Sequence, residues 1–328
     1  MAWLPPYNKL DETQLHFLDT AEFNKKNQWL KGFPGSGKSV LLVYTLQKIK
    51  KENPNSSVML IVFTKSLVEM FKAAFRELNL KASIGTQYDF KKTGEFYDYI
   101  LCDEVQDLSP NYLSLMKNRA KHIVVADDPN QSIFEKDPQT NERTVYPSEI
   151  TDLISGNSYE LNYIHRLSQN IIWAVQKFIP GIVGSRQDAT HHNTEIRLCE
   201  AESNEKEIIY VGDGALRAVN NGYFAAILFA KQDSVINFVN SYLRHLRKDT
   251  WEPSLNRWDK LDFGSLNSFL DRQGIAMQLV GNGYGKFNTN IRKVTLMTYH
   301  SSKGLDFDYV YIPFANNPFG KMERVISD

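Results

Sequence analysis

The residue types best suited to chemistry gather in two short segments of the first half of the chain. Residues 32–39 read Gly-Phe-Pro-Gly-Ser-Gly-Lys-Ser, a complete G-x-x-x-x-G-K-[ST] pattern. Residues 103–107 read Asp-Glu-Val-Gln-Asp and close an apolar run. The first segment can cradle phosphates, and the second can supply carboxylates to a metal ion and to water. Together they predict a site for phosphate chemistry on a nucleoside triphosphate.

Each part of the first segment has a physical role. Its three glycines allow successive backbone N–H groups to turn toward phosphates, at the positive end of a helix that begins near Lys38. The Lys38 ammonium is expected to reach the β- and γ-phosphates, and the Ser39 hydroxyl to ligate Mg²⁺. A bare glycine-rich turn is the alternative, but a predicted strand at 27–31 and a predicted helix from 40 favour the phosphate site. The predicted nucleotide-binding residues of this segment are Gly32, Pro34, Gly35, Ser36, Gly37, Lys38 and Ser39.

The acidic segment follows a predicted strand, at the edge where parallel sheets collect their ligands. Asp103 is expected to hold Mg²⁺, usually through water, and Glu104 to orient and deprotonate the attacking water. A solvated acidic turn is the alternative interpretation. The complete phosphate-binding pattern upstream favours the catalytic one.

The composition is that of a globular protein long enough for two domains. Its 38 basic and 38 acidic side chains balance, so a nucleic acid would have to be held by a local groove. The only cysteines, Cys102 and Cys199, have no metal-like spacing and indicate a reduced, cytoplasmic setting. No apolar stretch is long enough for a bilayer, and the first residues lack a secretory signal, so no membrane partner is expected.

Apolar runs alternate with amphipathic stretches, which predicts an α/β fold of mostly parallel sheets flanked by helices. The first half has predicted strands at 58–63, 99–102 and 122–126, and predicted helices at 67–77, 112–119 and 169–178. Pro180-Gly181 indicates a hinge between two lobes. Beyond it come an apolar run at 196–199, a helix capped by Ser203 and ending at 219, and a helix at 234–246. The remaining predicted elements are strands at 224–229, 276–280, 294–298 and 309–313 and a Trp-bearing insertion at 249–264.

The Asp-Glu-x-Gln-Asp form of residues 103–107 resembles the acidic motif of the UvrD/Rep-like superfamily 1 helicases. Further segments follow in that family's order, from about residue 10 to residue 313. They are Leu-Asp-Glu-Thr-Gln at 10–14, Asp-Pro-Asn-Gln-Ser-Ile-Phe at 128–134, Ile-His-Arg-Leu-Ser at 164–168 and Leu-Met-Thr-Tyr-His-Ser-Ser-Lys-Gly-Leu-Asp-Phe at 296–307. The resemblance implies two RecA-like lobes: an ATP-binding domain at 1–181 and a truncated domain at 182–328 without large accessory insertions.

The resemblance also assigns roles in a nucleotide site, which it places between the two lobes. It implies that Gln131 senses the γ-phosphate and that Arg166 reaches the phosphates from across the cleft. Gln14 inherits the reading of adenine, because an amide can donate and accept together, and His165 stands where the family stacks a tyrosine on the base. Turn chemistry is the alternative for Gln131, a cap or surface ion pair for Arg166, and a helix-surface position for Gln14. The residues that the second lobe would add are Gly304 and, near the ribose, Asp306.

Six residues fall where the family contacts the nucleic-acid strand or couples it to the nucleotide. They are Phe63, Thr64, Tyr88, Phe134, Thr298 and His300. A place in the hydrophobic core is the alternative for the three aromatic residues, and a buried structural histidine is the alternative for His300.

The chain also departs from the family. The interval between Phe63 and Asp103 leaves room for little more than one helix and one strand, which argues against sustained duplex opening. A histidine at position 165 in place of tyrosine predicts a looser preference for the base. The segment after Phe134 lacks a base-stacking tryptophan, which is worth about 1–3 kcal/mol per base. Tyr88 or the insertion that carries Trp251 and Trp258 would have to compensate, and a local cluster is the alternative for the two tryptophans.

The last departure concerns hydrolysis. The family's final motif, whose arginine reaches the γ-phosphate, is expected after the last residues of the sequence. Loss of such an arginine costs on the order of 10³–10⁵ in rate. A truncated chain, a protein partner that supplies the arginine, and a site that binds nucleotide with little hydrolysis all remain open.

The leading hypothesis is an ATP- and Mg²⁺-dependent helicase or translocase core that acts on single-stranded DNA, with RNA not excluded. The alternative is a nucleotide-gated binding or regulatory subunit of a nuclease or defence assembly, in which a partner supplies the missing arginine or the nuclease activity. A small-molecule kinase or signalling NTPase is disfavoured, because it does not explain Gln131 together with the segment at 296–307.

Overall fold

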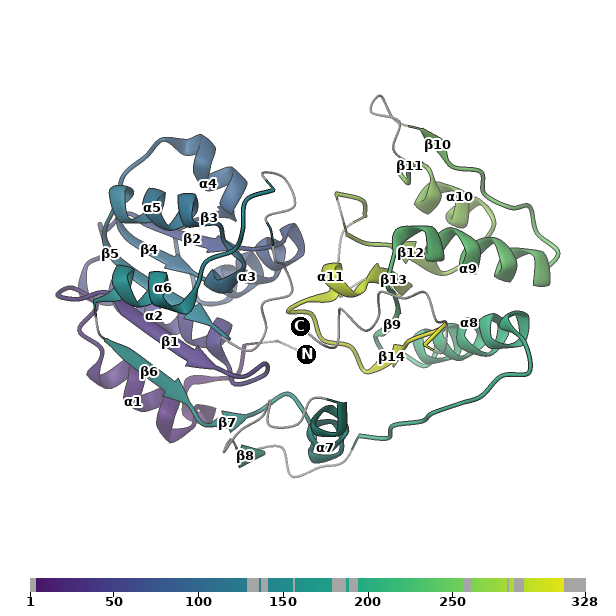
Figure 1. Cartoon of the computed structure of the whole chain (residues 1–328), viewed down its shortest axis with the longest axis horizontal. Helices are drawn as coiled ribbons and strands as arrows, with labels where there is room; N and C mark the ends of the chain where they lie inside the picture. Colours follow the sequence, from purple (N-terminus) through teal and green to yellow (C-terminus); the bar gives the residue numbers. More distant parts are fainter. Residues whose placement is uncertain are drawn as a thin grey trace. The chain divides into compact units, whose positions relative to one another are not determined.

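The computed structural model describes residues 4–128, 136, 141–155, 157–178, 187–188, 194–255, 261–281, 283–285 and 292–315. Within this part the chain forms two compact units, the first extending to Ile196 and the second beginning at Arg197. Both units are built on a parallel β-sheet flanked by helices, which confirms the α/β prediction (Figure 1). None of the described helices combines the length and the apolar composition that a bilayer span requires.

The first unit contains a six-stranded, wholly parallel sheet in the order β3-β2-β4-β5-β1-β6. Its strands are β1 (Gln28–Gly32), β2 (Val58–Val62), β3 (Ser83–Thr86), β4 (Tyr97–Cys102), β5 (Ala120–Asp127) and β6 (Ser158–Leu161). In such a sheet all carboxyl ends lie at one edge, so the loops that follow β1, β2, β4 and β5 meet there. The residues predicted to bind phosphate and metal lie at that edge.

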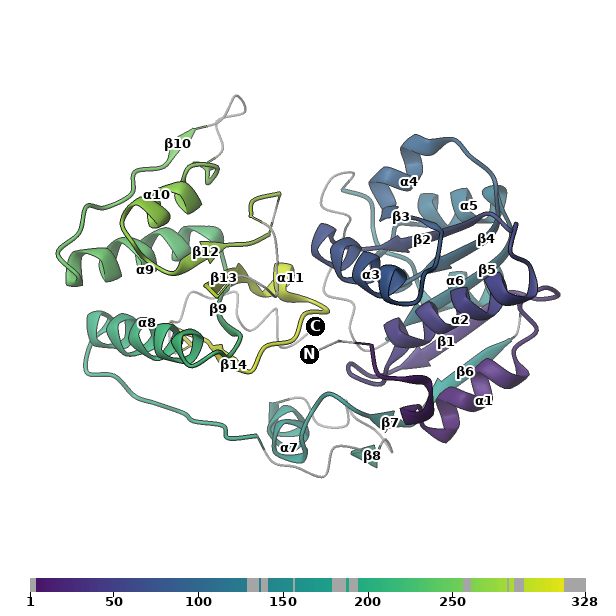
Figure 2. The ribbon, with the colours of Figure 1, turned by 180° about the vertical axis from the view of Figure 1, so that it is seen from behind.

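Helices cover both faces of this sheet. They are α1 (Glu12–Thr20), α2 (Lys38–Glu52), α3 (Lys65–Glu77), α4 (Gln87–Thr93), α5 (Pro110–Arg119) and α6 (Pro147–Ile154). Alternate strand residues such as Leu30 and Leu60 pack with α1, α2 and α3, whereas Trp29 and Ile61 pack with α5 and α6. Figure 2 shows α2 and α3 in front of the sheet, and Figure 1 shows α5 and α6 on the other side.

The remaining described elements of the first unit are short or lie outside the main sheet. They are the 3-10 helices η1 (Tyr7–Lys9) and η2 (Val105–Asp107), the parallel pair β7 (Tyr163–Ile164) and β8 (Gln187–Asp188), and helix α7 (Gln169–Phe178). Helix α7 has the predicted bounds, whereas the predicted hinge at residues 180–181 lies outside the described residues.

The interval between Phe63 and Asp103 holds more structure than predicted. It contains two helices, α3 and α4, and two strands, β3 and β4, instead of little more than one of each. The four residues of β3 read Ser-Ile-Gly-Thr and lack the apolar run that marks a buried strand, because β3 is the edge of the sheet. Strand β6 and helix α6 were likewise not predicted.

The second unit contains a four-stranded parallel sheet in the order β12-β13-β9-β14. Its strands are β9 (Ala225–Phe229), β12 (Met277–Leu279), β13 (Val294–Thr298) and β14 (Tyr309–Tyr311), and its helices are α8 (Asn204–Asn220), α9 (Gln232–His245), α10 (Leu266–Arg272) and α11 (Tyr299–Ser302). The core of this unit joins alternate residues of β9, β12 and β13 to α8, α9 and α10. The Ser203 hydroxyl accepts a hydrogen bond from the Lys206 N–H (3.2 Å), which confirms the predicted helix cap.

The apolar run at 196–199 forms no strand, and the Leu198 side chain is 99% exposed. Trp251 lies in the core against Phe263 and donates from Nε1 to the Ser265 hydroxyl (3.0 Å), so it presents no free ring to a base. Its insertion holds a short antiparallel pair, β10 (Ser254–Leu255) and β11 (Leu261–Asp262), and Trp258 lies outside the described residues.

Candidate nucleotide site

The phosphate-binding segment connects β1 to α2. Gly35 and Gly37 adopt left-handed backbone conformations, with φ of 79° and 90°. A Cβ on Gly37 would lie 2.3 Å from Gln14 Nε2, and one on Gly35 would lie 2.7 Å from Arg166 Cβ. These positions therefore require glycine, and α2 begins directly after them with its N–H groups at the loop. The other predicted loop residues are Gly32, which ends β1, and Pro34 and Ser36, which lie in the connection.

Lys38 and Ser39 occupy the first turn of α2 and already make polar contacts. The buried Lys38 ammonium donates to the carbonyls of Gly32 (2.8 Å) and Phe33 (3.3 Å). The Ser39 hydroxyl donates to Asp103 Oδ2 at 2.6 Å. Three of the residues predicted for phosphate and metal binding therefore lie at one point of the sheet edge.

Asp103 directly follows β4 and is buried. Burial, together with the nearby Glu104 carboxylate, raises the pKa of Asp103 to about 6, against the lowering effects of Ser39 and Lys38. The hydroxyl of Ser39 and the carboxylate of Asp103 are hard oxygen donors of the kind that Mg²⁺ prefers. Among the described residues, no group of three or more His, Cys, Asp or Glu side chains is placed to hold a metal ion. Two protein ligands suit Mg²⁺, which usually keeps waters and substrate phosphates in its shell.

Glu104 has an unusual backbone and a defined partner. Its φ of 53° lies in the left-handed region, directly before the turn η2. Gln106 Nε2 donates to Glu104 Oε2 at 2.6 Å. Gln106 is 4% exposed, and its other amide atom has no hydrogen-bond partner in the described part of the chain. Sequence reasoning assigned no role to Gln106, although its place two residues after Glu104 was visible.

Gln14 and His165 lie against the phosphate-binding loop. Gln14 is 3% exposed, so the alternative of a helix-surface position is wrong. Its Nε2 donates to the Ser36 carbonyl (2.9 Å), and its Oε1 accepts from the Asp11 N–H (3.0 Å). His165 Nε2 is 2.6 Å from Asp11 Oδ2, and the His165 N–H donates to the Gly35 carbonyl (2.8 Å). Both side chains that the resemblance assigns to the base are thus engaged within the chain.

Arg166 lies in the first unit, together with Lys38. Its Cβ is next to Gly35, at the loop itself. Arg166 also falls within the predicted domain at 1–181. The His165 N–H and the Arg166 Cβ both meet Gly35, so this segment lies against the phosphate-binding loop. The reach of Arg166 across a cleft stays a prediction.

A further carboxylate at this edge escaped the sequence analysis. Asp127 ends β5 and accepts a hydrogen bond from Trp29 Nε1 (2.7 Å), while Lys31 Nζ lies 3.9 Å from the centre of the Trp29 ring. Burial raises the pKa of Asp127 to about 6, although Trp29 and Lys38 oppose the shift. Its Oδ2 is buried and has no hydrogen-bond partner among the residues that the structure describes. Asp127 shares the face of Trp29, not the α2 face on which Leu30 lies.

The candidate strand-contacting residues of the first unit follow β2 and β3, which are neighbours in the sheet. Thr64 caps α3 by accepting from the Leu67 N–H (3.2 Å), and Phe63 beside it is half-buried. Tyr88 is half-buried, and its ring meets the Tyr112 ring edge-on with 6.2 Å between the ring centres.

Gln87, at the same edge, is a residue that sequence reasoning missed. It is 1% exposed, and within the described residues neither amide atom has a hydrogen-bond partner. The charges of Lys92 and Lys65 help the Thr86 backbone hydrogen bond to lower the pKa of nearby Asp89, so two cations lie close to this edge.

The candidate residues of the second unit lie at the end of β13 and beyond it. Thr298 caps α11 by accepting from the Ser301 N–H (3.3 Å). His300 is half-buried, and burial lowers its pKa. Gly304 has a φ of 80°, and Asp306 is exposed. Gln131 and Phe134 lie outside the described residues.

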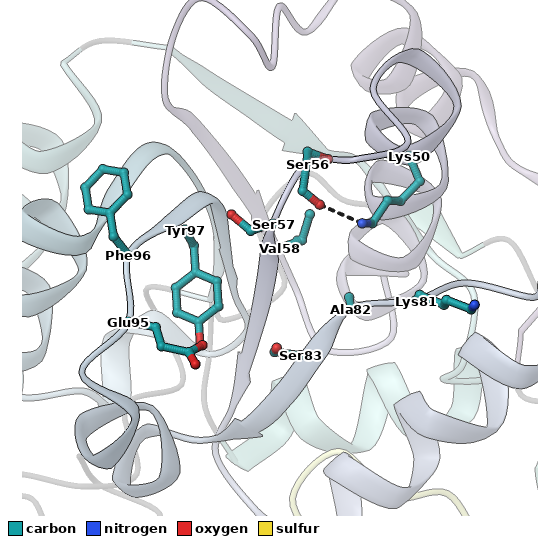
Figure 3. Close-up of a pocket in the computed structure, with 10 residues that line it drawn as sticks. All are labelled: Lys50, Ser56, Ser57, Val58, Lys81, Ala82, Ser83, Glu95, Phe96 and Tyr97. Atoms are coloured by element: carbon teal, nitrogen blue, oxygen red, sulfur yellow. Dashed lines mark hydrogen bonds between the residues drawn. The ribbon is translucent and has the colours of Figure 1, made fainter.

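A pocket of about 610 Å³ lies at the opposite edge of the first sheet, where β2, β3 and β4 begin (Figure 3). Lys50 points toward it from α2 and donates to the Ser56 carbonyl (2.6 Å). None of the predicted nucleotide residues lines this pocket. We therefore place the candidate site at the carboxyl edge, where Lys38, Ser39 and Asp103 lie together, and not in this pocket.

Comparison with known proteins supports part of the resemblance. Residues 29–180 match the model of the viral superfamily 1 RNA helicase core domain. The match covers just under half of the chain and includes both chemical segments of the first unit. It supports superfamily 1, whereas the narrower UvrD/Rep-like resemblance is not confirmed. A search of curated protein sequences returned no significant match.

Several solved helicase structures resemble the chain at a distance. The Pif1 helicase from Bacteroides, in complex with ADP-AlF3 and ssDNA, is 12% identical, with a TM-score of 0.46 over 92% of this chain and 86% of that one. The arterivirus nonstructural protein 10 (helicase) is 14% identical, with a TM-score of 0.37 over 92% of this chain. The Pif1 helicase from Candida albicans is 14% identical, with a TM-score of 0.43 over 75% of this chain. The chain spans 62% and 56% of the last two proteins, and likenesses this distant support no functional argument.

Proposed function

We propose that the chain is the core of an ATP-dependent helicase or translocase that acts on single-stranded nucleic acid. The observation that carries the proposal is the direct contact between Ser39 of the phosphate-binding loop and Asp103 of the acidic segment. That contact joins a phosphate cradle to a buried carboxylate at one sheet edge, which is the arrangement that nucleotide hydrolysis requires. The match of residues 29–180 to a superfamily 1 helicase core supports nucleic acid as the partner.

In the proposed reaction each residue of the first unit has one task. Lys38 exchanges its carbonyl partners, Gly32 and Phe33, for the phosphates of ATP. Ser39 and Asp103 would hold Mg²⁺, which would neutralise charge on the phosphates. Glu104 accepts the proton of the attacking water.

The partner strand is proposed to contact both units. Thr64 and Tyr88 would meet it on the first unit, where Lys65 and Lys92 supply positive charge for its phosphates. Thr298 and His300 would meet it on the second unit, at the turn where α11 begins. Gly304 and Asp306 remain proposed nucleotide contacts, and Arg166 remains a proposed phosphate contact from within the first unit.

The test is ATP hydrolysis with and without single-stranded DNA. Lys38→Ala and Glu104→Gln are each expected to lower kcat by at least about 100-fold, because they remove a phosphate contact and a general base. Lys50→Ala is the matched control, since Lys50 lies on the same helix but faces the pocket at the far edge. Unchanged hydrolysis in Lys38→Ala or Glu104→Gln would refute the assignment. Tight ATP binding without hydrolysis in the wild type would instead favour a nucleotide-gated binding module.

A further inference from the structure

We propose that Gln14, Asp11 and His165 form a brace that positions the phosphate-binding loop, and that the site selects a triphosphate with little regard to its base. The brace is defined by these three side chains and their contacts with Gly35 and Ser36. The inference rests on the proposed nucleotide binding, and it reverses the base-reading role that the resemblance gave to Gln14 and His165.

The amide of Gln14 is engaged at both ends. Its oxygen accepts from the Asp11 N–H, and the Asp11 carboxylate in return accepts from the Gln14 N–H (2.9 Å), so the two residues cap α1 reciprocally. The amide nitrogen donates to the Ser36 carbonyl at 2.9 Å. A glutamine reads a base by offering a donor and an acceptor together. Here each of the two atoms already makes a hydrogen bond within the chain, and the side chain is only 3% exposed, which leaves little surface for a base.

His165 is engaged in the same way. Its ring nitrogen lies 2.6 Å from Asp11 Oδ2, and its backbone N–H donates to the Gly35 carbonyl. Burial raises the pKa of Asp11, but hydrogen bonds from His165, Thr13 and the Gln14 N–H outweigh it and hold that pKa below its ordinary value. This contact fixes the orientation of the His165 ring, so the ring cannot reorient to suit different bases.

The loop needs such support because of its backbone. Gly35 and Gly37 both have positive φ, a conformation that no side chain of their own can stabilise. The Gln14 amide would lie 2.3 Å from a Cβ on Gly37, so it packs directly against the loop. Residues 35–37 are therefore held by contacts with α1 and with residues 165–166. These contacts pre-organise the N–H groups that are proposed to bind phosphate.

The experiment measures the affinity of the full chain for ATP, GTP and inorganic tripolyphosphate, with Mg²⁺ present. We expect ATP and GTP to bind with Kd values within about threefold of each other, because Gln14 and His165 are held by the loop and by Asp11. Gln14→Ala is expected to weaken all three ligands by the same factor of about tenfold, since the lost contact acts through the loop. The equally buried Gln28→Ala, whose amide donates to the carbonyls of Glu22 and Lys26, serves as the matched control.

The outcomes separate the inference from the function on which it rests. If the wild type prefers ATP over GTP by tenfold or more, the inferred role of the brace is wrong. It is also wrong if Gln14→Ala loses affinity for ATP alone. A wild type that binds none of the three ligands overturns the proposed function instead. The comparison of ATP with GTP uses only the wild type, so it decides the question even if Gln14→Ala does not fold.

Discussion

The carboxyl edges of the two parallel sheets carry different kinds of contact. In the first unit, Ser39 of α2 donates to Asp103 after β4, so this contact joins two elements that are 64 residues apart in sequence. Asp103, Glu104 and Gln106 add polar contacts within their own short segment. In the second unit, Thr298 hydrogen-bonds within its own turn, to Ser301 only three residues away. Both units have a parallel sheet flanked by helices, so the fold class alone does not explain why their contacts differ.

The difference teaches where each function can be disrupted. Contacts between elements hold charged groups at fixed positions, which catalysis requires. Contacts within one turn stabilise that turn and leave its outer face for a ligand. We therefore expect substitutions at the first edge to change hydrolysis and substitutions at the second edge to change mainly local stability.

Apart from the substitutions of Lys38 and Glu104 themselves, the largest effect is expected at Gln106, whose amide positions the Glu104 carboxylate. Gln106→Met keeps the length and apolar bulk of the side chain but removes the hydrogen bond to a charged group. Such a bond is worth about 1.5–3 kcal/mol, so kcat should fall by roughly 10–100-fold. The KM for ATP should remain unchanged, since Gln106 has no predicted phosphate contact. The control is Gln28→Met, which should leave kcat unchanged. A change in KM without a change in kcat would contradict the positioning role of Gln106.

A smaller effect is expected from Asp127, which tests whether every carboxylate of the first edge is catalytic. A carboxyl group whose pKa is raised in the fold stabilises the folded state only while it is protonated. That contribution is lost as the pH rises from the unfolded pKa of 3.8 to the folded pKa of about 6. Asp127→Asn should therefore raise the free energy of unfolding at pH 8 by about 1–3 kcal/mol.

Urea denaturation at pH 8 and at pH 4 measures this effect. At pH 4 the gain should largely disappear, because the wild-type carboxyl is then mostly protonated in the fold. An equal gain at both values would show that the substitution acts through packing and not through charge.

The smallest effect is expected at Thr298 in the second unit. Thr298→Ala removes the side-chain cap of α11, which should lower stability by about 0.5–2 kcal/mol. Thr298→Ser keeps the hydroxyl and should restore most of the loss. If thermal unfolding distinguishes neither variant from the wild type, the cap contributes nothing measurable and the contrast between the two edges weakens.

Sequence patterns predicted the fold well where elements are long and buried. The apolar runs at 58–63 and 294–298 became β2 and β13, and Ser203 caps α8 as its side chain suggested. The short edge strand β3 was missed because its residues lack an apolar run. The run at 196–199 has the pattern of a strand but pairs with none of the described strands.

The candidate site was predictable as a set of residues but not as a set of contacts. The spacing of Lys38, Ser39 and Asp103 indicates phosphate and metal chemistry, and the structure brings these side chains together. No spacing shows that the amide of Gln14 is engaged by Ser36 and Asp11, or that Arg166 lies against Gly35. Such facts depend on which polar groups the fold itself must satisfy when they are buried.

The left-handed backbone at Glu104 has a practical consequence for protein engineering. A non-glycine residue in that conformation costs on the order of 1–2 kcal/mol. Glycine at this position would relieve the strain, so a search for heat-resistant variants that scores only the melting temperature will tend to select glycine there. The variant that resists heat best would then lack the carboxylate on which turnover is proposed to depend, and selection for thermostability must be paired with an activity screen.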